Sequence, residues 1–421
     1  MHFTLQQSKI VKQSSVQITG SKSESNRLLL LQALYPEFKL ENVSNSDDSN
    51  LMTNALSSNE EVVDIHHAGT AMRFLTAYFS IQEGRETILT GSKRMTERPI
   101  KILVEALQEL GAEISYVQDH GFPPIKIKGA KLTKSKVSLK ANVSSQYISA
   151  LLLIASKLEN GLELTLEGEI TSVPYIKMTL SLLDEIGVES SFKENVITVK
   201  PNTKKLAPKT LTVESDWSSA SYYFCIAALS DVGTEITLSS YKANSLQGDS
   251  ALVEIYKHFG VSTVFNGNSL TLKKEHSNIE PLALDLKNAP DIAQTIAVTC
   301  FALGMPCDLV GLHTLKIKET DRLVALKTEI EKFDGEVKIT EKSLHLASNT
   351  LFDSNSSKSS SPSEGLEEAV SIATYNDHRM AMAFAPLALK TSIVIEDAMV
   401  VSKSYPTFWN DLESIGFNIS K

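Results

Sequence analysis

In the stretch LKIKETDRLVALKTEI at 315–330, four ionisable residues crowd into the five positions KETDR, as Lys318, Glu319, Asp321 and Arg322. The stretch is rich in helix formers, and its apolar residues recur at helical spacing. On a helix, Lys318 and Arg322 would project from one face and could close on an anion, while Glu319 would point to the side as a proton carrier. The alternative interpretation is a solvated first turn, in which the charges only pair with one another. The rest of the chain must decide between the two.

The composition indicates a globular protein that must bind any anion locally. The chain has 421 residues, of which 42% are hydrophobic and 22% charged, and this length predicts two domains. Its net charge of −9 argues against a general nucleic-acid surface. The start, MHFTLQQSKIVKQ, has no apolar core of signal-peptide length, and no run approaches the roughly 18 apolar residues of a membrane helix. We therefore expect a cytoplasmic protein.

The three cysteines, Cys225, Cys300 and Cys307, form no CxxC motif and no Cys/His ligand cluster. Two of them lie inside apolar helical runs. We interpret all three as packing residues, and we predict no metal site.

A helical run that ends in glycine recurs along the chain at intervals of about 75 residues. The glycines are Gly111, Gly187, Gly260, Gly335 and Gly416. Each suits a left-handed cap at a helix C-terminus. The stretch SDDSNLMTNALSSNEEVVDIHHAG, from Ser46, looks like a sixth copy that has lost its glycine end and one hairpin. The long last interval contains a Ser-rich run, near 353–365, that indicates a surface loop.

A second element, a polar turn that leads into an apolar helix, also occurs six times. The six turns begin at Ser21, His67, Val143, Ser215, Pro290 and Tyr375. Their helices are apolar on nearly every face, so they should lie inside a domain. Six units divide naturally as three plus three, and the N-termini of the buried helices can then attract anions even in an acidic protein.

Ten stretches, in order along the whole chain, carry a family resemblance. They are GSKSESNR (20–27), AGTAMRFL (68–75), RMTERPI (94–100), VSSQY (143–147), SVPYIKMTL (172–180), SDWSSASYYF (215–224), PDIAQTIAV (290–298), LKIKETDRL (315–323), YNDHRMAMAFAPLAL (375–389) and SKSYPTF (402–408). The sequence resembles the 5-enolpyruvylshikimate-3-phosphate synthase family of enolpyruvyl transferases. This resemblance implies an α/β fold, the two-domain inverse α/β barrel, with six repeated units and three per domain.

The resemblance also implies a reaction. The enolpyruvyl group of phosphoenolpyruvate would pass to the 5-hydroxyl of shikimate 3-phosphate, with release of phosphate, in the chorismate pathway to aromatic amino acids. No metal or organic cofactor is implied. We expect these two small molecules as the only partners, with no nucleic acid and no membrane, and we expect a monomer. Glyphosate is expected to compete with phosphoenolpyruvate.

Matching the family's motifs residue by residue implies the ligands of each substrate. The residues implied for phosphoenolpyruvate are Arg322 and Arg379 at the carboxylate, Lys22, Arg98, Gln146 and Lys403 at the phosphate, and Gly69 at a close backbone approach. Those implied for shikimate 3-phosphate are Lys22, Ser23, Arg27, Ser144, Ser145, Gln146, Ser172, Tyr175, Asp291, Thr314 and Lys318. For catalysis we expect Asp291 to deprotonate the 5-hydroxyl, Glu319 to exchange the methylene proton and Lys22 to stabilise charge at the leaving phosphate.

The sequence departs from the family pattern at several positions. His67 stands where the family usually has Asn, and its imidazole can titrate near neutral pH. Phe74 replaces a frequent proline, so the helix start could shift. Thr314 stands where some members have Asn. The stretch between Asp48 and His66 is short, which predicts a less regular first domain.

Chain order predicts that the domains are not simple halves. We expect one domain from 20–213, on the shikimate 3-phosphate side, and a second from 1–19 plus 214–421. The crossings at 19–20 and 213–214 would then be the hinge. Two alternatives remain for the function: an enolpyruvyl transferase that acts on UDP-N-acetylglucosamine, and a non-catalytic anion-binding relative.

Overall fold

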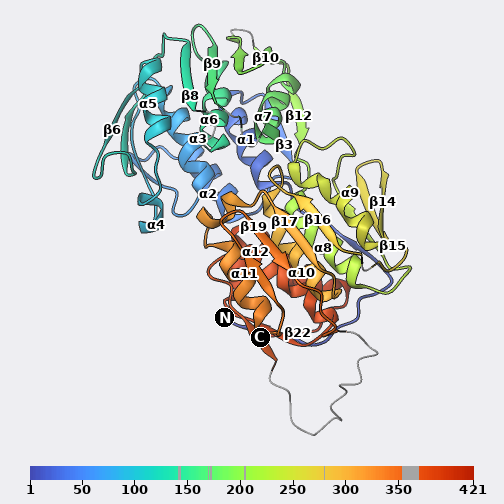
Figure 1. Ribbon diagram of the computed structural model, residues 1–421. Coiled ribbons are helices and arrows are strands. Elements are labelled where there is room, and N and C mark those ends of the chain that lie inside the picture. Colours follow the sequence, from blue (N-terminus) through green and yellow to red (C-terminus); the bar gives the residue numbers. More distant parts are fainter. Residues whose placement is uncertain (141–143, 169, 171–172, 203–204, 279, 353–368) are drawn as a thin grey trace. The chain divides into compact units, whose positions relative to one another are not determined.

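The computed structural model of the chain describes residues 1–140, 144–168, 170, 173–202, 205–278, 280–352 and 369–421 (Figure 1). These residues form two compact units, one made of Met1–Ile18 with Ser215–Lys421 and the other of Thr19–Glu214. We call them unit 1 and unit 2. Each has its own hydrophobic core. The Ser-rich run and Ser172 lie outside the described residues.

Unit 2 contains strands β3 to β12 and helices α1 to α7. The strands are β3 (Phe38–Glu41), β4 (Val62–Asp64), β5 (Glu86–Thr90), β6 (Glu113–Tyr116), β7 (Ile125–Lys128), β8 (Lys136–Lys140), β9 (Leu162–Glu167), β10 (Ser190–Lys193), β11 (Val196–Val199) and β12 (Lys209–Thr212). The helices are α1 (Lys22–Leu34), α2 (Asp47–Ser57), α3 (Gly69–Ser80), α4 (Lys93–Thr96), α5 (Lys101–Leu110), α6 (Ser145–Ala155) and α7 (Val173–Glu185).

Unit 1 contains the first two strands and all elements from α8 onward. Its strands are β1 (Phe3–Leu5), β2 (Gln13–Val16), β13 (Glu235–Ser239), β14 (Val261–Asn266), β15 (Ser269–Lys274), β16 (Leu282–Asp285), β17 (Cys307–Val310), β18 (Val337–Ile339), β19 (Ser343–Leu346), β20 (Val370–Ile372), β21 (Ile393–Ile395) and β22 (Ile419–Ser420). Its α-helices are α8 (Trp217–Leu229), α9 (Leu252–Ile255), α10 (Ala293–Ala302), α11 (Arg322–Glu331), α12 (His378–Phe384) and α13 (Phe408–Ile415). Its 3-10 helices are η1 (Gly248–Ala251), η2 (Tyr256–Phe259), η3 (Pro290–Ile292), η4 (His313–Ile317), η5 (Ala385–Leu389) and η6 (Ala398–Lys403).

One strand pattern repeats through both units. Among the described residues there are five four-stranded sheets, and each joins a parallel pair to an antiparallel pair, as in the order β16-β17-β19-β18. The antiparallel pair is a hairpin in four of them, whereas β1 and β22 come from opposite ends of the chain. The sixth sheet has only β12 and β3, in parallel. This two-stranded sheet confirms the predicted copy that has lost a hairpin. The six-unit prediction is therefore confirmed as well.

The N-terminal strands explain why unit 1 is discontinuous in sequence. Strand β2 pairs in parallel with β13, and β1 pairs with both β21 and β22. Figure 1 accordingly marks both chain ends at one end of unit 1. Residues 1–18 thus complete two sheets whose other strands come much later in the chain.

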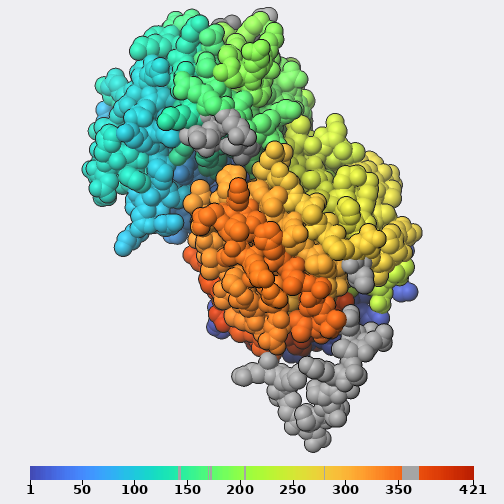
Figure 2. All heavy atoms as spheres, in the orientation of Figure 1, coloured from blue at the N-terminus to red at the C-terminus, as the bar shows by residue number. Residues whose placement is uncertain are grey.

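The predicted interior helices are buried. Every residue of α3 and of α10 is buried, as is nearly every residue of α8. A helix that is apolar on all faces keeps its side chains out of water only when the core surrounds it. The sheets lie outside: in Figure 2 the yellow residues of β13–β15 and the orange residues of β16–β19 form neighbouring parts of the surface of unit 1.

The glycine caps are confirmed except at one position. Gly111 and Gly416 end α5 and α13 with φ of 110° and 117°, in the left-handed region that glycine favours. The expectation for Gly335 is wrong, because Asp334 takes the positive φ, at 61°. Position 335 instead needs glycine because a side chain has no room there: an added Cβ would lie 2.5 Å from Cγ2 of Ile330.

Space also restricts Gly20, which directly precedes the turn into α1. A Cβ there would lie 1.9 Å from the backbone oxygen of Asn42 and 2.7 Å from Cγ1 of Val213. We predict that Gly20→Ala destabilises the protein by about 1–3 kcal/mol, because backbone atoms must move to admit the methyl group. Gly84→Ala is the control: its Cβ meets no atom within 4 Å, and only its positive φ of 79° opposes the change. Urea unfolding checks this, and equal midpoints for Gly20→Ala and the wild type would refute it.

Candidate active site

A buried arginine organises the predicted site residues of unit 1. The side chain of Arg322 is only 2% exposed, and its guanidinium bonds three carboxylates. Nε donates to Asp377 at 2.7 Å, Nη1 to Asp291 at 2.9 Å and Nη2 to Glu319 at 2.7 Å. A guanidinium out of water needs such partners, since its desolvation is otherwise strongly unfavourable.

The helix predicted around Lys318 begins later than expected. Helix α11 starts at Arg322, and Asp321 is its N-cap, accepting from the backbone N–H groups of Leu323 and Val324. Lys318 therefore lies before the helix, after η4, and does not share a helical face with Arg322. The two cations nevertheless meet, because Nζ of Lys318 lies 3.3 Å from the Asp291 oxygen that Arg322 bonds.

Asp291 is the point on which three cations converge. Besides Lys318 and Arg322, Nη2 of Arg379 bonds its second carboxylate oxygen at 3.3 Å. Burial alone would raise the pKa of Asp291, but the charges of Arg379, Lys318 and Arg322 outweigh burial and hold this pKa well below its usual value. These cations therefore hold Asp291 in its ionised form.

Thr314 and Lys403 are two further predicted residues of unit 1. Thr314 lies in η4, and its buried Oγ1 has no hydrogen-bond partner among the described residues. A buried hydroxyl without a partner is unfavourable, so it is available to a ligand. Nζ of Lys403, at the end of η6, donates to the backbone oxygen and to Oδ1 of Asn376, at 2.8 and 2.7 Å.

In unit 2, the first two turns of α1 carry three of the predicted residues. Lys22 is the first residue of the helix, and its Nζ lies 3.8 Å from Oδ2 of Asp48. The backbone oxygen of Ser23 accepts from Nη1 of Arg27 at 2.7 Å. Because Arg27 follows one turn after Ser23, it reaches back along the same helix face toward the N-terminus.

Arg27 is buried against neutral partners. Its Nε and Nη2 donate to Thr179 Oγ1 at 2.8 Å and Ser149 Oγ at 2.9 Å. The rings of Phe74 and Tyr175 lie 5.4 and 5.8 Å from its Cζ. Burial lowers the pKa of Arg27 to about 10. Its charge is thus held in the interior with little compensation, which favours an anion.

Phe74, one of the departures from the family pattern, is a buried residue of α3, and Cζ of Arg27 lies over its ring. Helix α3 begins at Gly69, within the stretch AGTAMRFL.

The N-terminus of α3 gathers another group. An added Cβ on Gly69 would lie 2.5 Å from Nη1 of Arg98, so this guanidinium rests against the first turn of α3. Nε2 of Gln146 donates to Oγ1 of Thr70 at 3.1 Å and reaches the same turn. Free N–H groups, a helix dipole and a cation together suit a phosphate.

The remaining predicted residues border this group. Ser144 is the N-cap of α6, exposed, and accepts from the N–H of Gln146, while Ser145 is buried as the first residue of the helix. His67 directly precedes the α3 turn, and its Nδ1 lies 2.8 Å from Nδ1 of His66. One of these nitrogens must carry a proton for the pair to bond.

Sequence reasoning missed Asp377, which bonds Arg322 and also accepts from the N–H of Arg379 at 2.9 Å. It stands in the quoted stretch YNDHR, two residues before Arg379, where an N-cap acid is a readable signal. Thr179 and Ser149, the partners of Arg27, gave no such signal, because only folding brings them together.

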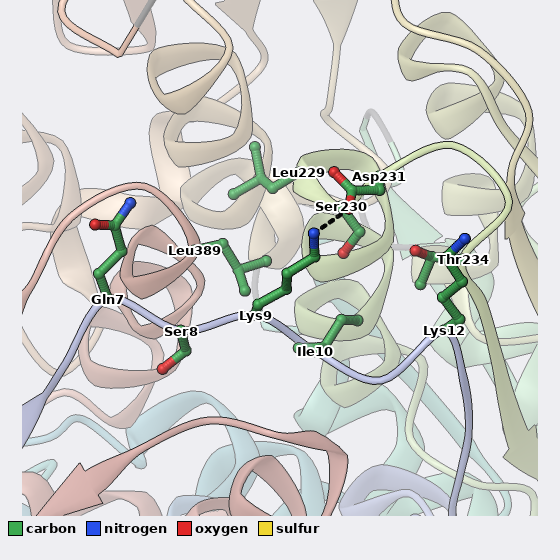
Figure 3. Close-up of a pocket in the computed structure, with 10 residues that line it drawn as sticks. All are labelled: Gln7, Ser8, Lys9, Ile10, Lys12, Leu229, Ser230, Asp231, Thr234 and Leu389. Carbon is green, nitrogen blue, oxygen red and sulfur yellow. Dashed lines mark ion pairs between the residues drawn. The ribbon is translucent and has the colours of Figure 1, made fainter. Parts of the chain in front are cut away.

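A surface pocket of unit 1 lies apart from these residues. It has a volume of about 370 Å³ and is lined by Gln7, Ser8, Lys9, Ile10, Lys12, Leu229, Ser230, Asp231, Thr234 and Leu389. Figure 3 shows the exposed ion pair of Lys9 with Asp231, at 2.8 Å, across it. None of the predicted site residues lines it.

The part of the chain that the structure describes contains no cluster of His, Cys, Asp or Glu suited to a metal ion. Its cysteines are buried and unpaired, which agrees with packing roles. No helix among the described residues combines the length and the apolar character needed to cross a membrane.

Solved structures share this fold. The chain superposes on EPSP synthase from Acinetobacter baumannii with a TM-score of 0.79 at 19% identity, covering 100% of both chains. At this identity the likeness shows the fold alone. The two-domain inverse α/β barrel predicted from the resemblance is thereby confirmed.

Sequence comparison defines the class and then the family. Residues 55–412 match the family model described as EPSP synthase (3-phosphoshikimate 1-carboxyvinyltransferase), which is a class of transferases. A protein of that name from Bacteroides fragilis (strain YCH46) is 48% identical over 96% of each chain, and one from Haemophilus influenzae is 33% identical over 96% of each. The chain belongs to the EPSP synthase family.

The two buried arginines Arg27 and Arg322 should respond oppositely to replacement by methionine. A lowered arginine pKa means that the folded state disfavours the charge, so removing it at pH 7 relieves a cost. We predict that Arg27→Met is at least as stable as the wild type. Arg322→Met leaves three carboxylates without their partner and should lose about 3–5 kcal/mol.

Urea unfolding of both variants without ligand tests this contrast. Losses of similar size in the two would contradict the assigned difference in their surroundings.

Proposed function

We propose that the residues described above are those with which this transferase moves the enolpyruvyl group of phosphoenolpyruvate to the 5-hydroxyl of shikimate 3-phosphate. The family's reaction forms 5-enolpyruvylshikimate 3-phosphate and phosphate, a step toward chorismate and the aromatic amino acids. The observation that carries the assignment is the convergence of Lys318, Arg322 and Arg379 on Asp291. Such a cluster offers both a clamp for a carboxylate and a base.

Unit 1 supplies the clamp and the acid/base pair. Arg322 and Arg379 bind the carboxylate of phosphoenolpyruvate, for which the planar guanidinium is suited. This carboxylate competes with Asp291 for the same N–H groups. As the cations turn to the substrate, the pKa of Asp291 rises and it becomes a stronger base for the 5-hydroxyl. Lys318 and Thr314 hold the shikimate hydroxyls.

Unit 2 supplies the anion pockets. Lys22, Arg98, Gln146 and the N–H groups beside Gly69 bind the phosphate of phosphoenolpyruvate, and Lys403 of unit 1 is proposed to add its charge. The residues proposed for shikimate 3-phosphate here are Ser23, Arg27, Ser144, Ser145, Ser172 and Tyr175. The lowered pKa of Arg27 supports this role, because an incoming anion would add a negative charge that stabilises the buried guanidinium.

The reaction proceeds by addition and then elimination. In the first step, Asp291 takes the proton of the 5-hydroxyl while the hydroxyl oxygen forms a bond to C2 of phosphoenolpyruvate. Glu319 gives a proton to the methylene carbon. In the second step, the methyl group returns a proton to Glu319, the double bond re-forms and phosphate leaves, with its charge stabilised by Lys22. No cofactor takes part in this proposal.

The alternative acceptor, UDP-N-acetylglucosamine, is disfavoured by the cysteines. An enzyme of that kind commonly uses a reactive loop cysteine, whereas the three cysteines here are buried in the core. Phosphate release with each acceptor in turn distinguishes the two enzymes and also a non-catalytic relative.

The proposal extends to the organisation of the protein. The chain crosses between the two units at residues 18–19 and 214–215. We assign the hinge to these crossings, with unit 2 on the shikimate 3-phosphate side, and we assign the protein to the cytoplasm as a monomer.

Removing the acid at Glu319 should stop turnover without abolishing binding. Glu319→Gln keeps the size of the side chain and can still accept from Arg322, but it cannot exchange the methylene proton. We predict a fall in kcat of about 10²–10⁴-fold with a small change in KM. Glu331→Gln, an exposed acid at the end of α11, is the control. Turnover near the control's value would assign the proton to another residue.

A methyl group at Gly69 should distinguish glyphosate from phosphoenolpyruvate. In Gly69→Ala, the Cβ pushes against the guanidinium of Arg98 and narrows the pocket. We predict that the variant weakens glyphosate much more than the smaller substrate, and that the wild type is inhibited. Inhibition measured at low phosphoenolpyruvate checks this. A wild type indifferent to glyphosate, or a variant no more resistant, would contradict the assigned pocket.

The proposed hinge predicts a change of shape on ligand binding. Cations and helix N-termini repel one another until an anion neutralises them, so shikimate 3-phosphate should make the protein more compact. Small-angle scattering with and without saturating ligand measures this change. Superimposable profiles would count against the hinge.

A further inference from the structure

Asp249 is a buried acid of unit 1 that has no role in the mechanism above. It stands in η1 and is 7% exposed. Its Oδ2 accepts from the hydroxyl of Ser218 in the first turn of α8. The same hydroxyl oxygen accepts from Nη2 of Arg379 at 3.2 Å. This nitrogen also bonds Asp291, so a continuous chain of contacts joins Asp249 to the base.

We propose that Asp249 is a positioning residue for the phosphoenolpyruvate clamp: through the Ser218 hydroxyl, it fixes the guanidinium of Arg379 beside Asp291. This inference rests on the proposed function of Arg379. Asp249 does not touch the reacting atoms. It acts by holding the serine so that its oxygen lone pairs face the arginine.

Capping of α8 does not explain Asp249. The N–H of Trp217 donates to Oε1 of Gln247 at 3.0 Å, and the N–H of Ser218 donates to Oδ1 of Asp216 at 2.9 Å. Two other side chains thus already satisfy the first N–H groups of the helix. The contact that the structure gives to the Asp249 carboxylate is the Ser218 hydroxyl, which leads to Arg379.

The charges around Asp249 make its role depend on pH. The charged groups that face it are Asp291 on η3, Arg379 on α12 and Asp216 before α8. Burial and then the charge of Asp291 raise the pKa of Asp249 to about 6, against the opposing charge of Arg379. The ionised carboxylate orients Ser218 by a charge-assisted bond, and protonation near pH 6 weakens that control.

Two substitutions test the positioning. Asp249→Leu and Ser218→Ala should each raise KM for phosphoenolpyruvate about tenfold, the size expected for one orienting hydrogen bond, and change KM for shikimate 3-phosphate less than twofold. Because both act through one chain of contacts, the double variant should be no worse than either single one. Equal rises in both KM values, or additive effects, would overturn the proposal.

A pH profile separates positioning from simple packing. Asp249→Asn keeps the shape but cannot ionise. We compare kcat/KM for phosphoenolpyruvate as the ratio of wild type to variant, because titration of the substrate cancels in this ratio. The ratio should rise from near one at pH 5 to severalfold at pH 8. Asp411→Asn is the matched control, since burial also raises the pKa of this acid while its carboxylate accepts from Thr407 instead of facing Arg379. A ratio that does not change with pH would refute the role.

Unfolding provides a readout that needs no substrate. A raised acid pKa means that the folded protein holds the proton longer, so this group's contribution to stability falls as pH rises from about 4 through 6. The stability of Asp249→Asn relative to the wild type should therefore increase between pH 4 and pH 7. An unchanged difference would contradict the buried titration. A wild type without turnover would refute the proposed function, whereas this comparison would still test Asp249.

Discussion

The buried charge of Arg322 is the constraint around which the site in unit 1 is built. A guanidinium with 2% of its side chain exposed is tolerated only if carboxylates surround it, and here they come from three separate segments. Asp377 starts α12, Asp291 stands in η3, and Glu319 precedes α11. One ion cluster therefore fixes three loops relative to one another, and each carries a proposed site residue.

The two units hold their buried arginines in different ways. Unit 1 holds Arg322 and Arg379 paired with its own acids, so the proposed substrate carboxylate would exchange one set of partners for another. Arg27 and Arg73 of unit 2 are equally buried, but their hydrogen bonds reach neutral groups such as Thr179 Oγ1 and the Gly69 oxygen, and burial lowers the pKa of each to about 10. The buried guanidinium groups of unit 2 thus carry positive charge that an anionic ligand could neutralise. This difference underlies the opposite stability effects expected for the two arginine-to-methionine variants.

Local patterns in the sequence predict the architecture, whereas burial and pairing need the fold. Glycine-ended helices and apolar runs predict six units, including the shortened one, because each repeat has to bury the same faces. The interpretation of KETDR as one helical face is wrong in its geometry, since Asp321 caps α11 and leaves Lys318 outside. Sequence spacing gives no sign that Arg322 is buried or that Ser218 lies between Asp249 and Arg379, because these contacts join residues 31 to 161 positions apart. The residue-by-residue family match names the ligands but not what holds them.

In the proposed mechanism, the low pKa of Asp291 connects substrate binding to catalysis. A carboxylate surrounded by Arg379, Lys318 and Arg322 is a poor proton acceptor, so the empty site is not arranged for deprotonation. The proposed carboxylate ligand shares the N–H groups of the two arginines with Asp291, and each bond that it takes removes positive charge from that acid. In the proposed mechanism, the base strength of Asp291 therefore grows as phosphoenolpyruvate binds, and the 5-hydroxyl is activated when the group that it attacks is in place. The proposed activation depends on the position of the Arg379 guanidinium, and the Ser218 hydroxyl that contacts this guanidinium also bonds the buried carboxylate of Asp249.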